Sequence, residues 1–212
     1  PYDDTASVHL TLVPYIPTAG EIKTKPTQHS VRELRGIGIQ PDFLMCRTVQ
    51  PIGEEARRKI ALFCNLPQEH VFDGTDAKSI YEVPMNLHEQ NFDKLLCQRL
   101  KLETVEPDMS SWQRMVSGIL NPPDTVRIAI VGKYVELKDA YKSIIESFVH
   151  AGIANHVGVV KIWVDSEDLE DSEVGDQRLK EIFNDCHAIL IPGGFGDRGI
   201  EGKIRAVGYA RQ

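Results

Sequence analysis

Hydrophobic and polar positions in the first half of the chain follow the order of an α/β domain. Residues 8–13 alternate apolar with polar side chains, which predicts a strand with one buried face. Residues 43–46 form a short apolar run typical of a buried parallel strand, and residues 71–72 predict a third, brief strand. Helical apolar spacing and turn signals between these runs predict helices over 27–36, 54–64, 77–81 and 85–100.

A second α/β pattern begins after a helix predicted over 110–120. Pro122 and Pro123 stop the periodicity, because proline continues neither a helix nor a central strand. Three apolar runs beyond them predict strands at 127–131, 157–164 and 188–191, which alternate with helical patterns around 139–152, 179–183 and 202–211. Such alternation predicts a parallel sheet with right-handed crossovers. We therefore expect an α/β fold of two parallel-sheet, three-layer domains, at 1–120 and 127–212, joined by a linker at 121–126.

Composition narrows the class of protein. The net charge of −7 over 212 residues argues against a nucleic-acid binder, so any anion site must be local. Four cysteines stand far apart and the seven histidines form no cluster, which predicts buried free thiols, no structural metal and a reducing cytoplasm. The sequence has no long apolar span, so no membrane contact is expected. Its start at Pro1 and its end in a helical pattern indicate an excerpt of a longer protein.

Residues 20–30 carry the strongest anion-binding signal. Pro26 disfavours helix at Lys25, so Lys23 and Lys25 are expected on extended chain with both ammonium groups on one side. The helix that follows would turn its free N–H groups and positive dipole end toward the same anion. This arrangement suits a polyphosphate. The alternative is two solvated lysines in a loop.

A glycine-rich loop at 192–199 follows the third strand of the second domain. Residues 194–199 match the G-x-G-x-x-G spacing of dinucleotide sites, but that motif belongs after the first strand of its unit. Glycines at a strand end also let backbone N–H groups approach a reacting carbonyl, as in an oxyanion hole. A third alternative is a tight turn without a ligand, and the residues alone leave all three open.

Several long motifs in one order resemble the CTP synthases over essentially the whole chain. They include GEIKTKPTQHSV at 20–31 and PGGFG at 192–196. Further matching segments lie at 8–15, 38–42, 59–65, 130–134 and 139–143, together with Arg198 and Gly199. The resemblance implies the C-terminal part of a P-loop-NTPase-like synthetase domain, followed by the N-terminal part of a class I glutamine amidotransferase domain.

The resemblance also implies an activity and its ligands. CTP synthases use ATP and Mg²⁺ to phosphorylate the 4-oxygen of UTP, and ammonia then displaces phosphate to give CTP. The ammonia comes from glutamine, which a Cys-His-Glu triad hydrolyses, and it travels inside the protein. The family is tetrameric, is activated by GTP and is inhibited by CTP at a site that overlaps the UTP site.

Site residues follow from the matching positions. UTP and CTP contacts would fall on Lys23, Thr24, Lys25, Pro26, Thr27, Gln28 and Lys59. Asp76 would lie beside the adenine of ATP, although its neighbours Thr75 and Ala77 differ from some members of the family. Gly194 would supply the oxyanion N–H for glutamine.

The resemblance equally implies functional parts that this sequence does not contain. The P-loop, the Mg²⁺ carboxylates and a further uridine-nucleotide segment would precede Pro1, and the nucleophilic cysteine with its His and Glu would follow Gln212. None of Cys46, Cys64, Cys97 or Cys186 occupies the nucleophile position. We therefore expect the 212-residue piece to be inactive alone. A non-catalytic nucleotide-sensing or assembly module and a dinucleotide-dependent oxidoreductase are the competing hypotheses.

Overall fold

The computed structural model describes residues 4–212, apart from the side chains of Lys138 and residues 172–175. The chain divides into unit 1, which ends at Gln113, and unit 2, which spans Arg114–Gln212. This division falls within helix α5 (Ser110–Leu120), whereas the sequence pattern puts the linker at 121–126. The domain limits inferred from the pattern stay a prediction.

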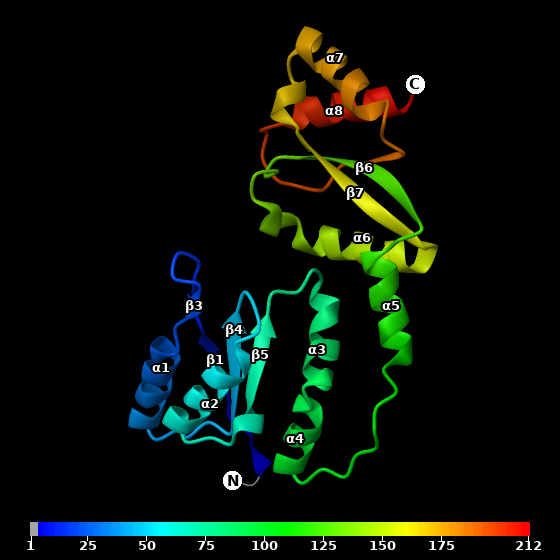
Figure 1. The fold of residues 1–212 in the computed structure, drawn as a ribbon. Coiled ribbons are helices and arrows are strands. Elements are labelled where there is room, and N and C mark those ends of the chain that lie inside the picture. The colour runs from blue at the N-terminus through cyan, green and yellow to red at the C-terminus, as the bar shows by residue number, and fades with distance from the viewer. Residues whose placement is uncertain (1–3) are drawn as a thin grey trace. The chain divides into compact units, whose positions relative to one another are not determined.

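Unit 1 is built on a parallel three-stranded sheet in the order β1-β4-β5 (Figure 1). Its strands are β1 (Val8–Leu12), β4 (Phe43–Thr48) and β5 (Val71–Thr75), with a small antiparallel pair β2 (Tyr15–Ile16) and β3 (Glu21–Ile22). Its helices are α1 (Lys25–Gly36), α2 (Gly53–Cys64), α3 (Val83–Glu89) and α4 (Phe92–Arg99), with short 3₁₀ turns η2 (Gln68–His70) and η3 (Ile80–Glu82). The predicted strands and the first two helices are confirmed.

Helices cover both faces of this sheet, as the α/β prediction requires. On one face, Val31 of α1 and Ile60 of α2 pack with Leu44 and Val71 of the strands in one buried cluster. On the other face, the ring of Phe92 in α4 lies edge-on to Phe72, with ring centroids 5.0 Å apart. Because successive strand residues point to opposite faces, Val71 and Phe72 serve the two layers in turn.

The burial of β1 differs from the sequence expectation. Its apolar side chains Val8, Leu10 and Leu12 are 43%, 64% and 61% exposed, while polar Thr11 is 5% exposed. The reason is position: β1 is an edge strand of the described sheet, and Thr11 is on the face that α1 covers. The prediction of a strand was correct, and the prediction of which face is buried was wrong.

Two helical predictions in unit 1 need correction. The helix predicted over 77–81 is only the 3₁₀ turn Ile80–Glu82, and the helix predicted over 85–100 is two helices, α3 and α4. The break is at Asn91, whose φ of 61° is left-handed. Beside it, the Gln90 amide accepts from the Asp73 backbone N–H at 2.7 Å and donates to the Asp73 carbonyl at 3.0 Å. These bonds tie the break to β5.

Unit 2 has a second parallel sheet in the order β7-β6-β8. Its strands are β6 (Asp124–Gly132), β7 (Val157–Asp165) and β8 (Ala188–Leu190). Its helices are α6 (Lys142–Asn155), α7 (Ser172–Phe183) and α8 (Ile200–Ala210), with the 3₁₀ turns η4 (Lys138–Tyr141) and η5 (Glu167–Leu169). The βαβαβ prediction is confirmed, although β6 begins at Asp124 rather than at 127 because Asp124 pairs with Val157.

The sheet of unit 2 also separates two helical layers, with α6 on one face and α7 and α8 on the other (Figure 1). Leu179 of α7 and Ala206 of α8 join Ala129 and Val164 of the strands in a single buried cluster. Both units are therefore α/β layers around parallel three-stranded sheets. In such sheets, ligand sites gather at the carboxyl ends of the strands.

Candidate functional site

A cavity of about 490 Å³ lies between the starts of α1 and α2 in unit 1. Its lining includes Thr24, the residue before α1, and Gly53, Glu54 and Glu55, the first residues of α2. Both helices begin without a side-chain cap. Because the first N–H groups of a helix have no partner inside the helix, two sets of backbone donors and two positive dipole ends meet at this cavity. That is the arrangement expected of an anion site.

The conformation around the two lysines differs from the expected extended chain. Lys25 is the first residue of α1, and Thr24 has helical dihedral angles (φ −89°, ψ −16°). Pro26 therefore starts the helix instead of delaying it, since proline fits the first turn, where its missing N–H would have no partner. The prediction that Lys25 is extended was wrong. Lys23 does precede the helix, and its backbone N–H donates to the Pro14 carbonyl at 2.8 Å.

The β2–β3 hairpin, which the sequence pattern missed, delivers Lys23 to the start of α1. Strands of two residues are too short to show a period, so the sequence offered only the prolines at 14 and 17 as a signal. The ammonium group of Lys23 forms an ion pair with Glu21 at the end of this hairpin, and both side chains are about half exposed. Lys23 is therefore held close to the cavity wall, which Glu21 lines.

The remaining residues of the segment have mostly local partners. Thr24 is buried and its hydroxyl accepts from the Gln28 amide at 3.2 Å. Thr27 is fully buried, donates to the Leu12 carbonyl at 3.1 Å, and thereby fixes α1 on β1. Pro26 and Lys25 are exposed on the first turn. Of the predicted contacts, the structure brings Thr24 and Lys59 into the cavity lining and gives Thr27 a packing role.

Charge in the cavity is mixed. Lys59 enters the lining from the second half of α2 and is exposed, while Glu54 and Glu55 stand in the first turn of the same helix. Carboxylates in a first turn stabilise the helix dipole, but they also oppose a bare anion. A ligand that brings both phosphate groups and a cation would suit this lining better than an isolated anion.

Asp73 of β5, which the sequence analysis overlooked, fixes the start of α2. Its carboxylate accepts from the backbone N–H of Ile52 at 3.3 Å and from the guanidinium of Arg57 at 2.7 Å. The side chains of Asp73 and Arg57 are only 15% and 21% exposed. Arg57 also donates to the Val71 carbonyl. This one side chain therefore ties α2 to the first and third residues of β5.

Asp76 follows the carboxyl end of β5, as expected, and forms an ion pair with Arg47 at the end of β4. Arg47 in turn donates to the Gly74 carbonyl at 2.9 Å. A largely apolar cavity of about 370 Å³ adjoins this pair and includes Met45, Ile80 and Leu87 in its lining together with Arg47. Arg47 thus lines this cavity and at the same time holds Asp76.

The cysteines behave as packing residues. Cys46 and Cys64 are buried in the core of unit 1, and burial raises their thiol pKa values to about 12 and about 11. Cys186 is half-buried and burial raises its pKa as well. Since the thiolate is the nucleophile, these three thiols are poorly suited to attack. The prediction of buried free thiols is confirmed for Cys46 and Cys64, whereas Cys97 and Cys186 are half-buried.

The glycine-rich loop at 192–199 leaves the carboxyl end of β8 and leads into α8, as predicted. Gly194 is exposed on it, so a ligand can reach its backbone. Gly199, which caps α8, has a φ of 72°, and a Cβ there would overlap the Ser166 hydroxyl. Only glycine fits that position without strain. The loop follows the third strand of its unit, which is the position that argued against a dinucleotide motif.

One buried cation, Lys133, and one exposed cation, Arg198, hold this loop. Lys133, 5% exposed, donates to the carbonyls of Phe195 at 3.1 Å and Gly196 at 2.7 Å. Arg198 donates to the Lys133 carbonyl at 2.8 Å and forms an ion pair with Glu167. The sequence analysis quoted Lys133 in a motif without assigning it a role. A lysine directly after a buried strand, at the sheet edge where sites form, was the available signal.

The described residues also bear on metal binding and on membrane crossing. Within residues 4–212, no group of three or more His, Cys, Asp or Glu side chains is arranged to hold a metal ion. Nor does any helix in this part of the chain have the length and hydropathy needed to cross a membrane.

Comparison with protein families assigns both units. Residues 1–102 match the family described as CTP synthase N-terminus, and residues 136–212 match glutamine amidotransferase class-I. The class is therefore an α/β protein that joins a CTP synthase N-terminal segment to the start of an amidotransferase domain. The chain belongs to the CTP synthase family.

Two CTP synthases agree with this assignment. The chain is 53% identical over 207 residues to a CTP synthase of Methanocaldococcus jannaschii and 51% identical over 211 residues to one of Clostridium acetobutylicum. The alignments cover 97% and 100% of the chain, which spans 38% of the length of each relative. A solved structure, the glutaminase domain of Trypanosoma brucei CTPS with bound acivicin, is 42% identical over 41% of the chain and 32% of its own, with a TM-score of 0.37.

Proposed function

We propose that this chain serves the ATP-dependent amination of UTP to CTP with ammonia released from glutamine, in pyrimidine biosynthesis. Unit 1 would bind the triphosphate of UTP, or of CTP as feedback inhibitor, and unit 2 would bind glutamine. The observation that carries the proposal is the cavity that brings Thr24, Lys59 and two uncapped helix starts together. Membership of the CTP synthase family supports it independently.

The cavity offers both kinds of phosphate contact. Backbone N–H groups at the starts of α1 and α2 would donate to oxygens of the triphosphate, and Lys59 would neutralise charge from one wall. Lys23 would exchange its half-exposed partner Glu21 for a phosphate oxygen, which is a stronger acceptor of charge-assisted hydrogen bonds. Lys25, Pro26 and Gln28 would contribute through the first turn of α1, and Thr27 by holding α1 on β1.

ATP would place its adenine in the apolar cavity at the end of β5. Met45, Ile80 and Leu87 would contact the ring faces, and the Arg47–Asp76 pair at the edge would meet its polar side. The carboxylates that hold Mg²⁺ and the residues that bind the ATP phosphates would come from parts of the family outside the 38% of its length that this chain spans. Mg²⁺ would supply charge neutralisation for phosphoryl transfer.

In unit 2, Gly194 would donate its backbone N–H to the oxyanion formed on the glutamine carboxamide. The raised thiol pKa values of Cys46, Cys64 and Cys186 support a nucleophile from another part of the family sequence. On this proposal, the 212-residue piece has neither glutaminase nor synthetase turnover. Activation by GTP, a homotetramer and a cytoplasmic location remain predictions from the family.

The test compares two cations at the cavity, Lys23 before α1 and Lys59 on α2, with a third cation of α2 in the full-length protein. Lys59→Ala and Lys23→Ala should each raise the UTP concentration for half-maximal rate about tenfold, because each removes a charge-assisted contact to phosphate. CTP inhibition should weaken in parallel, since the triphosphate sites overlap. Arg58→Ala is the matched control: Arg58 is also exposed on α2, but it is outside the described lining of the cavity. Steady-state CTP formation measures all three.

Unchanged UTP and CTP responses in both lysine variants would remove the triphosphate assignment. A full-length protein that binds UTP but forms no CTP from glutamine or ammonia would instead be the nucleotide-sensing or assembly module. Wild-type turnover therefore decides between the two functions before any variant is made.

A further inference from the structure

Two lysines from different elements direct their ammonium groups at the inner side of the glycine-rich loop. Lys203, on the first turn of α8, donates to the Pro192 carbonyl at 2.9 Å. Lys133, after β6, donates to the carbonyls of Phe195 and Gly196. Gly194 lies between these anchored peptides. A Cβ on Gly194 would lie 3.6 Å from the Lys203 ammonium, so this cation is directly against the residue proposed to bind the oxyanion.

The arrangement has an electrostatic penalty. Burial lowers the pKa of Lys203, and the neighbouring charge of Lys133 lowers it further. Both lysines bond to neutral carbonyl oxygens of the loop, and neither has a described ion-pair partner. Two like charges under one loop, bonded to carbonyls, do not maximise stability. They do fix the direction in which each anchored carbonyl points.

Because the peptide group is planar, the direction of each anchored carbonyl also sets the direction of the N–H group that follows it. The C=O and N–H of a trans peptide point in opposite directions, so a carbonyl drawn inward turns the next N–H outward. Lys203 thus directs the N–H of Gly193 away from the interior, and Lys133 does the same for Gly196 and Asp197. These three N–H groups, which lie on both sides of exposed Gly194, therefore point away from the two ammonium groups.

We propose that Lys203, together with Lys133, is a positioning residue for glutamine hydrolysis, which aims the backbone donors on both sides of Gly194 at the developing oxyanion. The inference rests on the proposed amidotransferase role of unit 2 and adds the group that sets its geometry. Lys203 acts through the loop and does not touch the substrate. Its effect is confined to the reaction of glutamine, since free ammonia bypasses that step.

The test is Lys203→Met in the full-length protein, with CTP formation measured once from glutamine and once from ammonia. Methionine keeps the length and packing of the side chain and removes the donor and the charge. We expect the glutamine-dependent kcat to fall about tenfold, which is less than the roughly 10²–10³-fold loss caused by removing an oxyanion donor outright. The KM for glutamine and the ammonia-dependent rate should stay within about twofold. Lys203→Arg, which keeps both donor and charge, should recover most of the loss.

Lys180→Met is the matched control, because Lys180 is an exposed lysine on the adjacent helix α7. It should change neither rate. If Lys203→Met fails to fold, Lys203→Gln keeps one N–H donor without the charge and should retain more glutamine-dependent activity than any apolar substitution. Equal loss from glutamine and ammonia, or no loss from either, would overturn the inference. Wild-type protein that forms CTP from ammonia but never from glutamine would overturn the amidotransferase role itself.

Discussion

Lysine side chains serve opposite purposes in the two units. In unit 1, Lys23 and Lys25 are exposed at the start of α1, and Lys59 is exposed in the second half of α2. The ion-pair partner of Lys23 is an exposed carboxylate. In unit 2, Lys133 is buried and Lys203 is partly so, and both bond to carbonyl oxygens of the chain itself. The first arrangement leaves charge free for a ligand. The second arrangement uses the charged groups to fix the conformation of the 192–199 loop.

The difference indicates which groups of each proposed site would contact the ligand: side chains in unit 1 and the backbone in unit 2. A site that binds through charged side chains, as proposed for Lys23 and Lys59 at the cavity of unit 1, needs rigid helices behind those side chains. A site that binds through backbone N–H groups, as proposed for the 192–199 loop, needs the backbone itself to be fixed, because a misplaced peptide cannot be corrected by rotating a side chain. Substitutions should therefore alter affinity in unit 1 and geometry in unit 2.

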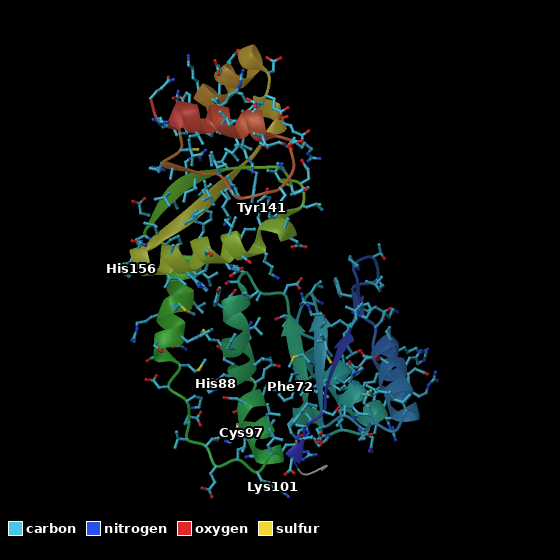
Figure 2. All side chains as sticks on the ribbon, turned by 180° about the vertical axis from the view of Figure 1, so that it is seen from behind. Phe72, His88, Cys97, Lys101, Tyr141 and His156 are labelled. Carbon is cyan, nitrogen blue, oxygen red and sulfur yellow. The ribbon has the colours of Figure 1, made fainter. Side chains whose placement is uncertain are left out.

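The largest effect is expected from adding one methyl group in α8, the helix that follows the 192–199 loop. Gly202, in the first turns of α8, is buried, and a Cβ there would overlap the backbone carbonyl of Ser166 (Figure 2 shows the dense side-chain packing of this unit). Gly202→Ala should destabilise unit 2 by about 3 kcal/mol and abolish glutamine-dependent activity, because α8 must move away from η5. Thermal unfolding of the full-length protein, followed by calorimetry, measures the change.

Gly208→Ala is the control in the same helix. A Cβ there meets no described atom within 4 Å, so the substitution only improves helix propensity and should be neutral or stabilising by up to about 1 kcal/mol. If Gly202→Ala were as harmless as Gly208→Ala, the close approach of α8 to Ser166 would not constrain the loop.

A smaller effect is expected from Asp73→Asn in unit 1. The change removes the charge that holds Arg57 and weakens the bond to the Ile52 N–H at the start of α2. Because both side chains are less than a quarter exposed, stability should fall by about 2 kcal/mol. The KM for UTP should rise more than kcat falls, since the start of α2 positions the ligand rather than the chemistry.

Asp76→Asn provides the comparison for stability. Asp76 also pairs with an arginine, but its side chain is 57% exposed and that of Arg47 is 49% exposed. Exposed pairs of this kind contribute about 0–1 kcal/mol, so unfolding should barely change. Equal destabilisation by the two variants would show that burial is not what makes the Asp73 pair important.

The smallest effect concerns a half-buried pair between α3 and α4. His88 bonds to Asp93 at 2.7 Å, and that hydrogen bond, with the nearby charges of Asp93, Glu106 and Glu89, raises the pKa of His88 above 6.5. A raised pKa means that the folded state holds the proton more tightly. The stabilisation is complete below about pH 6.5 and is lost as pH rises through the folded pKa. The melting difference between wild type and His88→Gln should therefore shrink from pH 5.5 to 8.5. A constant difference would contradict it.

Periodicity predicted the regular parts of the fold well. Runs such as 43–46 and 127–131 are buried strands because their apolar side chains serve both layers of a parallel sheet. Periodicity predicted the helix boundaries less well where a single residue determines the break. Asn91 breaks one apolar helical pattern into two helices, and Gln90 holds the break on β5, a contact that lies 17 positions away along the chain.

For the sites, motifs identified the segments but not the contacts within them. The segment 20–31 does lie at a cavity, yet Pro26 starts the helix there, and Thr27 packs on β1. The supports Asp73, Lys133 and Lys203 were missed because each acts on residues distant in sequence, and the motif that contains Lys133 does not show what its side chain contacts. Long-range hydrogen bonds of this kind become visible only once the sheets are assembled.

The two core thiols of unit 1 can be used to measure how often α2 separates from the sheet. Cys46 on β4 and Cys64 on α2 are fully covered and remain protonated at physiological pH. An alkylating dye can reach them only when α2 lifts from the sheet, so their rate of modification counts those openings directly. Since α2 also carries Lys59, slower alkylation in the presence of nucleotide would register occupancy of the cavity without any engineered label.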